Sequence, residues 1–179
     1  MILSNRKEKT MNEVIRSLLS RRSVRSYMEK QVPLDKVLMV VEAGRYAPNG
    51  MHQEPWHFTV LRNAEKLEQL NKLVLGENTL DSFFYHAPTL VLVSIEIGNA
   101  FAQADSACAM TNMMNAAHSL GIASVWCNRI NGNSSIDTKL TAFGVPQGYQ
   151  VTATLALGYG AAAPSSEWKI KENTVTVVE

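Results

Sequence analysis

Hydrophobic positions along the chain recur with two periods, one typical of helices and one typical of strands. A spacing of three and four residues predicts a helix from Asn12 to about residue 20, a second from Pro33 to a stop at 48–50, and three more over 64–75, 99–120 and 135–143. Apolar runs predict strands at 56–61, 89–95, 122–127 and 151–157, and a strand-like tail at 174–178. This loose alternation indicates one layered domain of the α+β or α/β class.

Two of these segments indicate where the centre of the molecule lies. Residues 89–95 are continuously apolar, which is typical of a strand covered by helices on both faces. The helix over 99–120 is apolar nearly all round and has seven alanines between 100 and 117. We therefore expect this helix to be buried on several sides, at the centre or at a subunit interface.

Composition narrows the class of protein. The 179 residues are 46% hydrophobic and 18% charged, which suits one compact core over 1–179 and excludes a disordered or collagen-like chain. The formal net charge of +1 provides no overall field for nucleic acid or an anionic membrane, so we expect neither as a partner. The tail, about residues 160–179, follows a long loop and could reach a partner subunit.

The cysteines, the histidines and the N-terminus point to a reduced, cytoplasmic setting without a metal. Cys108 and Cys127 fit no disulfide or metal pattern and are expected to be buried thiols. The four histidines have no ligand spacing. We also find no signal peptide and no run of roughly 18 uncharged apolar residues that could span a membrane.

A local excess of positive charge lies at the end of the first helix. From Arg16 to Tyr27 the chain has four arginines and no acidic residue. One interpretation is a set of cations at a helix C-terminus, worth about 0.3–1 kcal/mol. The other is a phosphate site, because guanidinium groups bind phosphate in a bidentate manner and a serine hydroxyl adds a donor. The candidate donors are Arg21, Arg22, Ser23 and Arg25.

A second polar segment, APNGMHQEPWHF at 47–58, joins the stop of a helix to a strand. Its Pro-Asn-Gly forces a turn, and the segment displays amide and imidazole groups. An ordinary polar connection is the alternative interpretation. The chain has no GxSxG, no Walker loop and no GxGxxG after a strand. Serine hydrolases, P-loop enzymes and Rossmann dehydrogenases therefore lose support.

Taken in order, these segments resemble the nitroreductase family of FMN-dependent oxidoreductases. The match includes RRSVRSY at 21–27, the segment at 47–58, DSACAMTNMMNAAHSLGIASVWCN at 105–128 and FGVPQGYQVTATLALGY at 143–159. It covers nearly all of the chain from Val14 onward. The resemblance implies an α+β fold with a mixed central sheet flanked by helices, in an intertwined homodimer with FMN in two clefts at the interface.

The resemblance also implies which residues form the site. Those that would hold the phosphate and the nearby ribityl oxygens are Arg21, Ser23, Lys169 and Lys171, with Arg22 close by. Arg25 would lie near N1 and O2 of the flavin ring, where a cation stabilises the reduced ring. One side of the ring would be bordered by Pro48, Asn49, Gly50 and Gln53 contributed by the second chain. The other side would be bordered by Trp126, Cys127 and Asn128.

The implied activity has two half-reactions at a tightly bound FMN. NAD(P)H reduces the cofactor, and a nitroaromatic, a quinone or a similar electrophile then takes the electrons. No catalytic side chain is needed, because the cofactor carries the chemistry. Two alternatives stay open. One is a specialised flavin relative: a reductive dehalogenase, an enal or semialdehyde reductase, or an enzyme that consumes its own flavin with oxygen. The other is a non-enzymatic module that binds nucleic acid or a protein phosphate.

Overall fold

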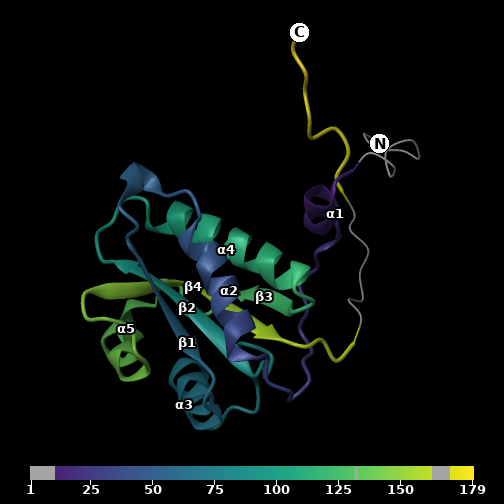
Figure 1. Ribbon diagram of the computed structural model, residues 1–179. Coiled ribbons are helices and arrows are strands. Elements are labelled where there is room, and N and C mark those ends of the chain that lie inside the picture. Colours follow the sequence, from purple (N-terminus) through teal and green to yellow (C-terminus); the bar gives the residue numbers. More distant parts are fainter. Residues whose placement is uncertain (1–10, 132, 163–169) are drawn as a thin grey trace.

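The computed structural model describes residues 11–131, 133–162 and 170–179. Helices cover both faces of a four-stranded sheet (Figure 1), so the expected α+β fold is confirmed. The helices are α1 (Glu13–Ser20), α2 (Leu34–Arg45), α3 (Ala64–Leu75), α4 (Ala102–Ser119) and α5 (Ser134–Asp137), with 3-10 turns η1 (Gly50–His52) and η2 (Thr138–Phe143). The strands are β1 (Trp56–Leu61), β2 (Thr89–Glu96), β3 (Ala123–Cys127) and β4 (Tyr149–Gly158).

The strands lie in the order β1-β2-β4-β3, and each neighbouring pair is antiparallel. Within the described ranges, the parallel pairing expected of a mixed sheet is limited to an isolated bridge between Ser23 and Ser124, beside β3. β2 and β4 form the centre of the sheet and are buried over almost their whole length. β1 and β3 are the two edges.

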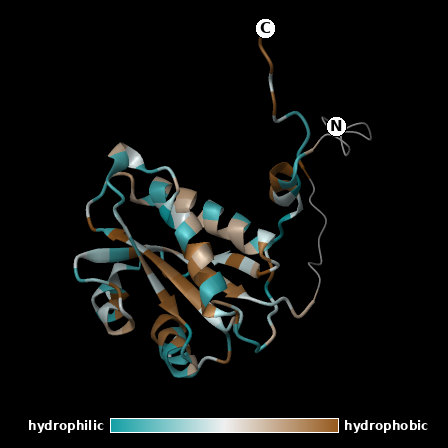
Figure 2. Ribbon diagram, viewed as in Figure 1, coloured by the Kyte–Doolittle hydropathy of each residue, from teal (hydrophilic) through white to brown (hydrophobic). Residues whose placement is uncertain are grey.

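The apolar run of β2 contributes to two hydrophobic cores, one on each face of the sheet, as expected for a covered strand. Successive residues of a strand point to opposite faces. Leu90 and Leu92 therefore pack on the side of α3, whereas Val91 and Val93 pack on the side of α2 and α4. Figure 2 shows the hydrophobic strands between more polar helices.

α4 lies beside α2 on one face of the sheet (Figure 1), and the two helices approach closely at Gly44. A Cβ atom at Gly44 would lie 2.8 Å from Cγ of Met113, so a glycine is needed at this contact. Near its start α4 accepts a hydrogen bond at Asp105 from the turn η1, and near its end His118 contacts Ser20 of α1. α4 therefore lies between the two polar segments described above, the arginine segment at 16–27 and the segment at 47–58.

α1 and residues 170–179 project from the body on the same side (Figure 1). α1 buries none of its residues, although Val14, Ile15, Leu18 and Leu19 form an apolar stripe. Residues 170–179 are all exposed. The strand expected at 174–178 is not formed, because a strand needs a hydrogen-bonded neighbour and none of the described residues provides one beside the tail.

The described residues contain neither a membrane-spanning helix nor a cluster of metal ligands. None of the helices among them is both long enough and apolar enough to cross a membrane. In the same part of the chain, no three side chains of His, Cys, Asp or Glu gather in a way that could hold a metal ion.

Candidate functional site

The arginine segment that follows α1 is held against β3 by backbone hydrogen bonds. Arg21 is the C-cap of α1, and its N–H donates to the carbonyl of Ser17 (3.1 Å). Further on, the N–H of Val24 donates to the carbonyl of Ser124 (3.1 Å), where Ser23 and Ser124 form the isolated bridge. Ser23 thus contributes its backbone to this contact, and its side chain is exposed.

Arg21 and Arg22 line a hollow of about 390 Å³ at the start of β3, which we call the basic hollow. Nη1 of Arg22 donates to the carbonyls of Leu19 (2.9 Å) and Arg21 (2.8 Å), which fixes the direction of the guanidinium. The rest of the wall comes from Ser20, Val24, His118, residues 121–124, Gly160 and Ala162. None of the described lining residues is acidic, so this described part of the wall favours an anion.

Arg25 turns away from the basic hollow toward the other end of β3. Its guanidinium carbon lies 5.9 Å from the centre of the Tyr85 ring, and its charge acts on Cys127 and Tyr27. Tyr85 and Cys127 line a second hollow, of about 510 Å³, which we call the end hollow. Its other lining residues are Leu75, Asp81, Ser82, Phe83, Trp126, Asn128 and Arg129.

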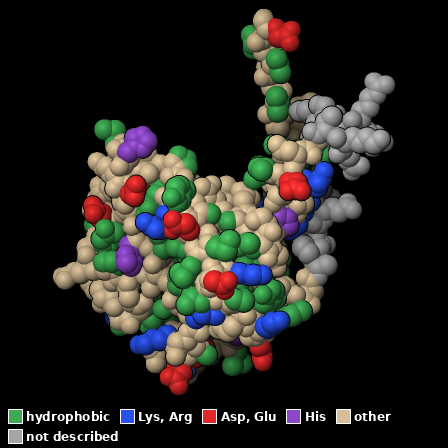
Figure 3. Space-filling model, in the orientation of Figure 1, with side chains coloured by type: hydrophobic (Ala, Val, Ile, Leu, Met, Phe, Trp, Pro, Cys, Tyr) green, Lys and Arg blue, Asp and Glu red, His purple; other side chains and the backbone are tan. Residues whose placement is uncertain are grey.

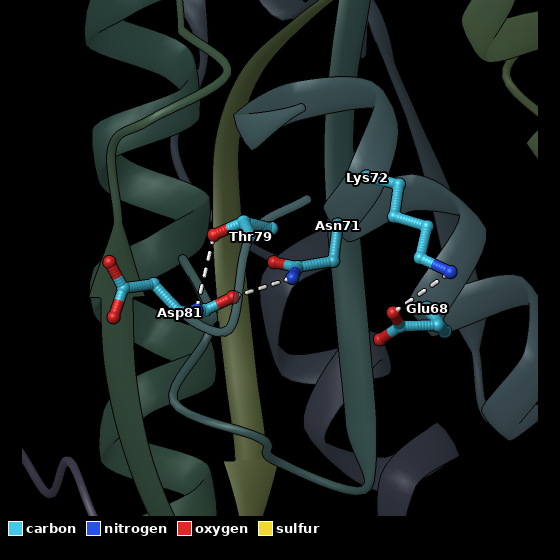
Figure 4. A network of polar contacts seen from close by, with 5 residues as sticks. All are labelled: Glu68, Asn71, Lys72, Thr79 and Asp81. Carbon is cyan, nitrogen blue, oxygen red and sulfur yellow. Dashed lines mark hydrogen bonds and ion pairs between the residues drawn. The ribbon is translucent and has the colours of Figure 1, made fainter. Parts of the chain in front are cut away.

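The far wall of the end hollow is held in place by a buried asparagine of α3. Nδ2 of Asn71 donates to the carbonyl of Asp81 (2.7 Å), and its Oδ1 accepts from the N–H of Phe83 (3.2 Å). The N–H of Asp81 in turn donates to the hydroxyl of Thr79 (3.1 Å; Figure 4). These bonds order a loop that has no helical or strand structure, so the hollow is preformed in the single chain.

Burial disfavours the deprotonation of two side chains near Arg25, the thiol of Cys127 and the phenol of Tyr27. It raises the pKa of the Cys127 thiol to about 11, against smaller lowering effects of the Ala156 backbone and of Arg25. Burial likewise raises the pKa of the Tyr27 phenol. Both groups are therefore neutral near pH 7. Arg25 forms no ion pair with any described residue. Its positive charge therefore lies beside neutral side chains at the edge of the end hollow.

The segment 48–53 lies at the other end of α4. The N–H of Gly50 donates to Oδ1 of Asp105 (2.9 Å), whereas the basic hollow meets the same helix at His118. These two helix positions are 13 residues apart, about 20 Å at ~1.5 Å per residue. In one chain, none of the four predicted residues Pro48, Asn49, Gly50 and Gln53 lines either hollow.

The predicted site residues thus fall into separate groups. Arg21 and Arg22 share the basic hollow, and Trp126, Cys127 and Asn128 share the end hollow with Arg25 beside it. Lys171 is exposed on the tail and lines neither hollow. Lys169 lies outside the described residues.

His118 and Tyr85 are among the lining residues that sequence reasoning did not single out. His118 belongs to the segment 105–128 that carries the resemblance, and it reaches the basic hollow through the packing of α4. Tyr85 reaches the end hollow through the loop after α3. The only local signal for His118 was its place in the last turn of a helix directly before β3.

Three comparisons connect these features with known proteins. The model of the nitroreductase family matches residues 18–80 and 77–159. A nitroreductase from Bacteroides fragilis NCTC 9343, crystallised with bound FMN, is 42% identical, with a TM-score of 0.88 over 94% of this chain and 100% of that chain. A provisionally named NADH dehydrogenase/NAD(P)H nitroreductase from Methanothermobacter thermautotrophicus is 28% identical over 158 residues, which are 86% of this chain and 81% of that protein.

A more distant likeness covers part of the chain. Iodotyrosine deiodinase 1 of Pongo abelii is 33% identical over 73 residues, which are 41% of this chain and 25% of that protein. The family match, in contrast, extends from the last turns of α1 through β4. The chain therefore belongs to the nitroreductase family and is an oxidoreductase.

Proposed function

We propose that the protein is an FMN-dependent oxidoreductase that uses NAD(P)H to reduce nitroaromatics, quinones or similar small electrophiles in two half-reactions. The observation that carries this proposal is the pair of hollows along β3. One end offers two arginines to an anion, and the other offers an aromatic ring, a neutral thiol and a third arginine.

The donor set fits a ligand with a phosphate at one end and an aromatic ring system at the other. Arg21 and Arg22 would hold the phosphate, since guanidinium groups bind phosphate oxygens in a bidentate manner. Four residue steps separate Ala123 in the basic hollow from Cys127 in the end hollow, about 13 Å at ~3.3 Å per step. An elongated cofactor such as FMN would lie along this strand.

At the end hollow, the side chains of this chain would set the electrostatics around the ring. A bound flavin would supply the two-electron chemistry. The positive charge of Arg25, which faces neutral Cys127 and Tyr27, would stabilise negative charge on the ring. Tyr85, on a loop ordered by Asn71, would help exclude water from this end.

We propose a homodimer in which each site is built by both chains. The segment 48–53 is about 20 Å from the basic hollow along α4, so Asn49 and Gln53 would meet a cofactor held by the second chain. The apolar stripe of α1 is exposed in the single chain, with Leu18 at 46% and Val14 at 65% exposure. Figure 3 shows further exposed hydrophobic side chains on the face that carries α2. A partner would cover such surfaces.

The same proposal gives a role to the C-terminal tail. The chain would form one domain over residues 1–179, with its tail from about 160 reaching the partner subunit. Lys171, and Lys169 outside the described residues, would then add positive charge to a phosphate site. We also propose a cytoplasmic location, which the two free cysteines support.

The test is a spectrum followed by two anaerobic mixing steps with the purified full-length protein. We expect a yellow protein that releases FMN, loses its visible absorbance with NADH or NADPH, and regains it when a quinone or a nitroaromatic is added. A preparation that stays colourless after addition of FMN would refute the proposal. The non-enzymatic alternative predicts that result, but the mixed acidic and basic surface in Figure 3 does not favour it.

A second candidate function is reductive dehalogenation, which the partial identity to an iodotyrosine deiodinase favours. It uses the same cofactor site and differs in the acceptor. Adding a halogenated phenol in place of the quinone in the second mixing step separates the two. Halide release coupled to flavin reoxidation would assign this activity.

A further inference from the structure

His118 lies in the wall of the basic hollow, and the proposed function assigns it no role. It belongs to the last turn of α4, so it approaches the hollow from the helix opposite the arginine segment. Its Nε2 atom is 2.8 Å from Oγ of Ser20, the residue at the end of α1. The imidazole is therefore fixed on one side by a side chain that also lines the hollow.

The hydrogen bonds of Ser20 determine what each ring nitrogen can do. We assign the single hydrogen of Ser20 Oγ to the carbonyl of Ser17 (3.2 Å), which makes the hydroxyl oxygen the acceptor toward His118. Nε2 of His118 is then the donor and carries a hydrogen. Nδ1 has no hydrogen-bond partner within the described part of the chain. It can donate to an anion only if the ring takes up a second proton.

The other charged groups around the ring cannot take up a proton when an anion binds. Arg21 and Arg22 face the hollow from the end of α1, and arginine stays protonated at any ordinary pH. The walls formed by residues 121–124, Gly160 and Ala162 contain no titratable side chain. Among the described residues of this wall, His118 is the one whose side chain exists in both a neutral and a positively charged form.

We propose that His118 is a phosphate-binding residue whose protonation is coupled to cofactor binding. When the phosphate enters the basic hollow, one proton from solvent is taken up at Nδ1, which then donates to a phosphate oxygen while Nε2 keeps its bond to Ser20. This inference rests on the proposed function, because FMN supplies the phosphate. Its consequence is that the cofactor is retained less well as the pH rises above neutrality.

The test is the dissociation constant of FMN between pH 7 and 8.5, measured by quenching of flavin fluorescence on the full-length apoprotein. In this range the phosphate is already a dianion, since its second pKa is about 6. We expect the constant of the wild type to rise by up to about tenfold per pH unit, the limit for uptake of one proton. His118→Gln, which cannot titrate, should show a flat profile. His57→Gln on β1, away from both hollows, should retain the slope of the wild type.

Riboflavin, which lacks the phosphate, is the probe that locates the effect. Its affinity should not change with pH in the wild type or in the glutamine variant. If FMN shows the same pH profile in wild type and His118→Gln, the proposal is wrong. Calorimetry of FMN binding to the wild type in two buffers of different ionisation enthalpy gives a test that needs no variant. Uptake of up to one proton near pH 7.5 supports the proposal, and no uptake refutes it.

Failure of the proposed function gives a different result. In that case the wild type binds no flavin at any pH, and inorganic phosphate becomes the probe for the hollow. Nuclear magnetic resonance should then show the titration of His118 moving to higher pH as phosphate is added. An unchanged titration would overturn the role of His118 as well.

Discussion

The backbone N–H of Gly50 donates a 2.9 Å hydrogen bond to Oδ1 of Asp105, a buried carboxylate in the first turn of α4. This bond anchors a segment with a costly backbone, because Met51, His52 and Glu54 have φ values of 58°, 53° and 47°. Left-handed conformations of this kind cost about 1–2 kcal/mol per residue. The packing of α4 therefore holds the segment 48–53 in a shape that it would not adopt alone.

Replacing this carboxylate should release the segment. We expect Asp105→Ala to lower the free energy of unfolding by about 1–3 kcal/mol, because the N–H of Gly50 loses its partner in a partly buried place. Asp105→Asn keeps an oxygen acceptor and should lose less. Urea unfolding of both variants measures the difference. Equal losses would show that the hydrogen bond is not what the segment depends on.

Removing an arginine from the basic hollow should weaken cofactor binding much more than it lowers the stability of the fold. Arg21→Ala should weaken FMN binding by about tenfold or more, since a hydrogen bond to a charged group is worth about 1.5–3 kcal/mol. The same change should barely alter the unfolding midpoint, because helix-end arginines contribute little to stability. Flavin fluorescence and thermal melting are the two measurements.

Arg16→Ala is the matched control for that variant. Arg16 belongs to the same exposed helix but lines neither hollow, and its guanidinium donates to the carbonyl of Met11. We expect normal FMN binding. Normal binding by Arg21→Ala too would mean that the phosphate is held elsewhere.

If each site is built by both chains, a variant that dissociates the dimer should also lose its bound cofactor. Leu18→Glu places a charge in the apolar stripe of α1, which buries nothing in its own chain. We expect sedimentation to show a larger monomer fraction, and the flavin absorbance to move with the dimer only. Arg16→Ala again serves as the control on the same helix. A monomer that carries flavin would contradict the shared site.

The buried thiol predicts how stability depends on alkaline pH. Burial raises the pKa of Cys127 to about 11, against roughly 8.5 for an exposed cysteine. Between these values the unfolded chain has lost a proton that the folded chain keeps, so the free energy of unfolding falls as the pH rises. Below about pH 8.5 the thiol has no such effect.

Unfolding of Cys127→Ala between pH 8 and 10.5 should therefore show a shallower decline than the wild type, whatever its stability at pH 8. Cys108→Ala should keep the steeper decline, because Cys108 is only partly buried. The partly buried Tyr27 adds to the decline in every variant, since burial raises its pKa as well. A slope unchanged by Cys127→Ala would refute this account.

The elements whose signals are local were predicted almost to the residue. β1 has the expected bounds 56–61, and α3 has the expected bounds 64–75, because Asn63 caps its start and Gly76 ends it. The apolar run of β2 correctly predicted helices on both faces. The predicted helix at 99–120 was longer than α4, since the residues before Ala102 form a turn in which the side chain of Asn99 accepts from the N–H of Phe101.

The site was predicted less completely, because much of it depends on packing between distant segments. The arginine excess did locate the basic hollow through Arg21 and Arg22, but Arg25 belongs to the opposite end of β3. No spacing rule indicated that His118 would face Ser20 across 98 residues of sequence. The strand predicted at 174–178 is not formed, because no described residue pairs with the tail through backbone hydrogen bonds.

The length of α4 has a genetic consequence. It keeps the segment around Gly50 and the hollow around Arg21 about 20 Å apart within each polypeptide. With shared sites, an Arg21→Ala chain and a chain defective in Gln53 would damage different halves of each cleft. Mixed in one cell, two inactive proteins would assemble hybrids in which one of the two clefts receives both intact halves, and part of the activity would return.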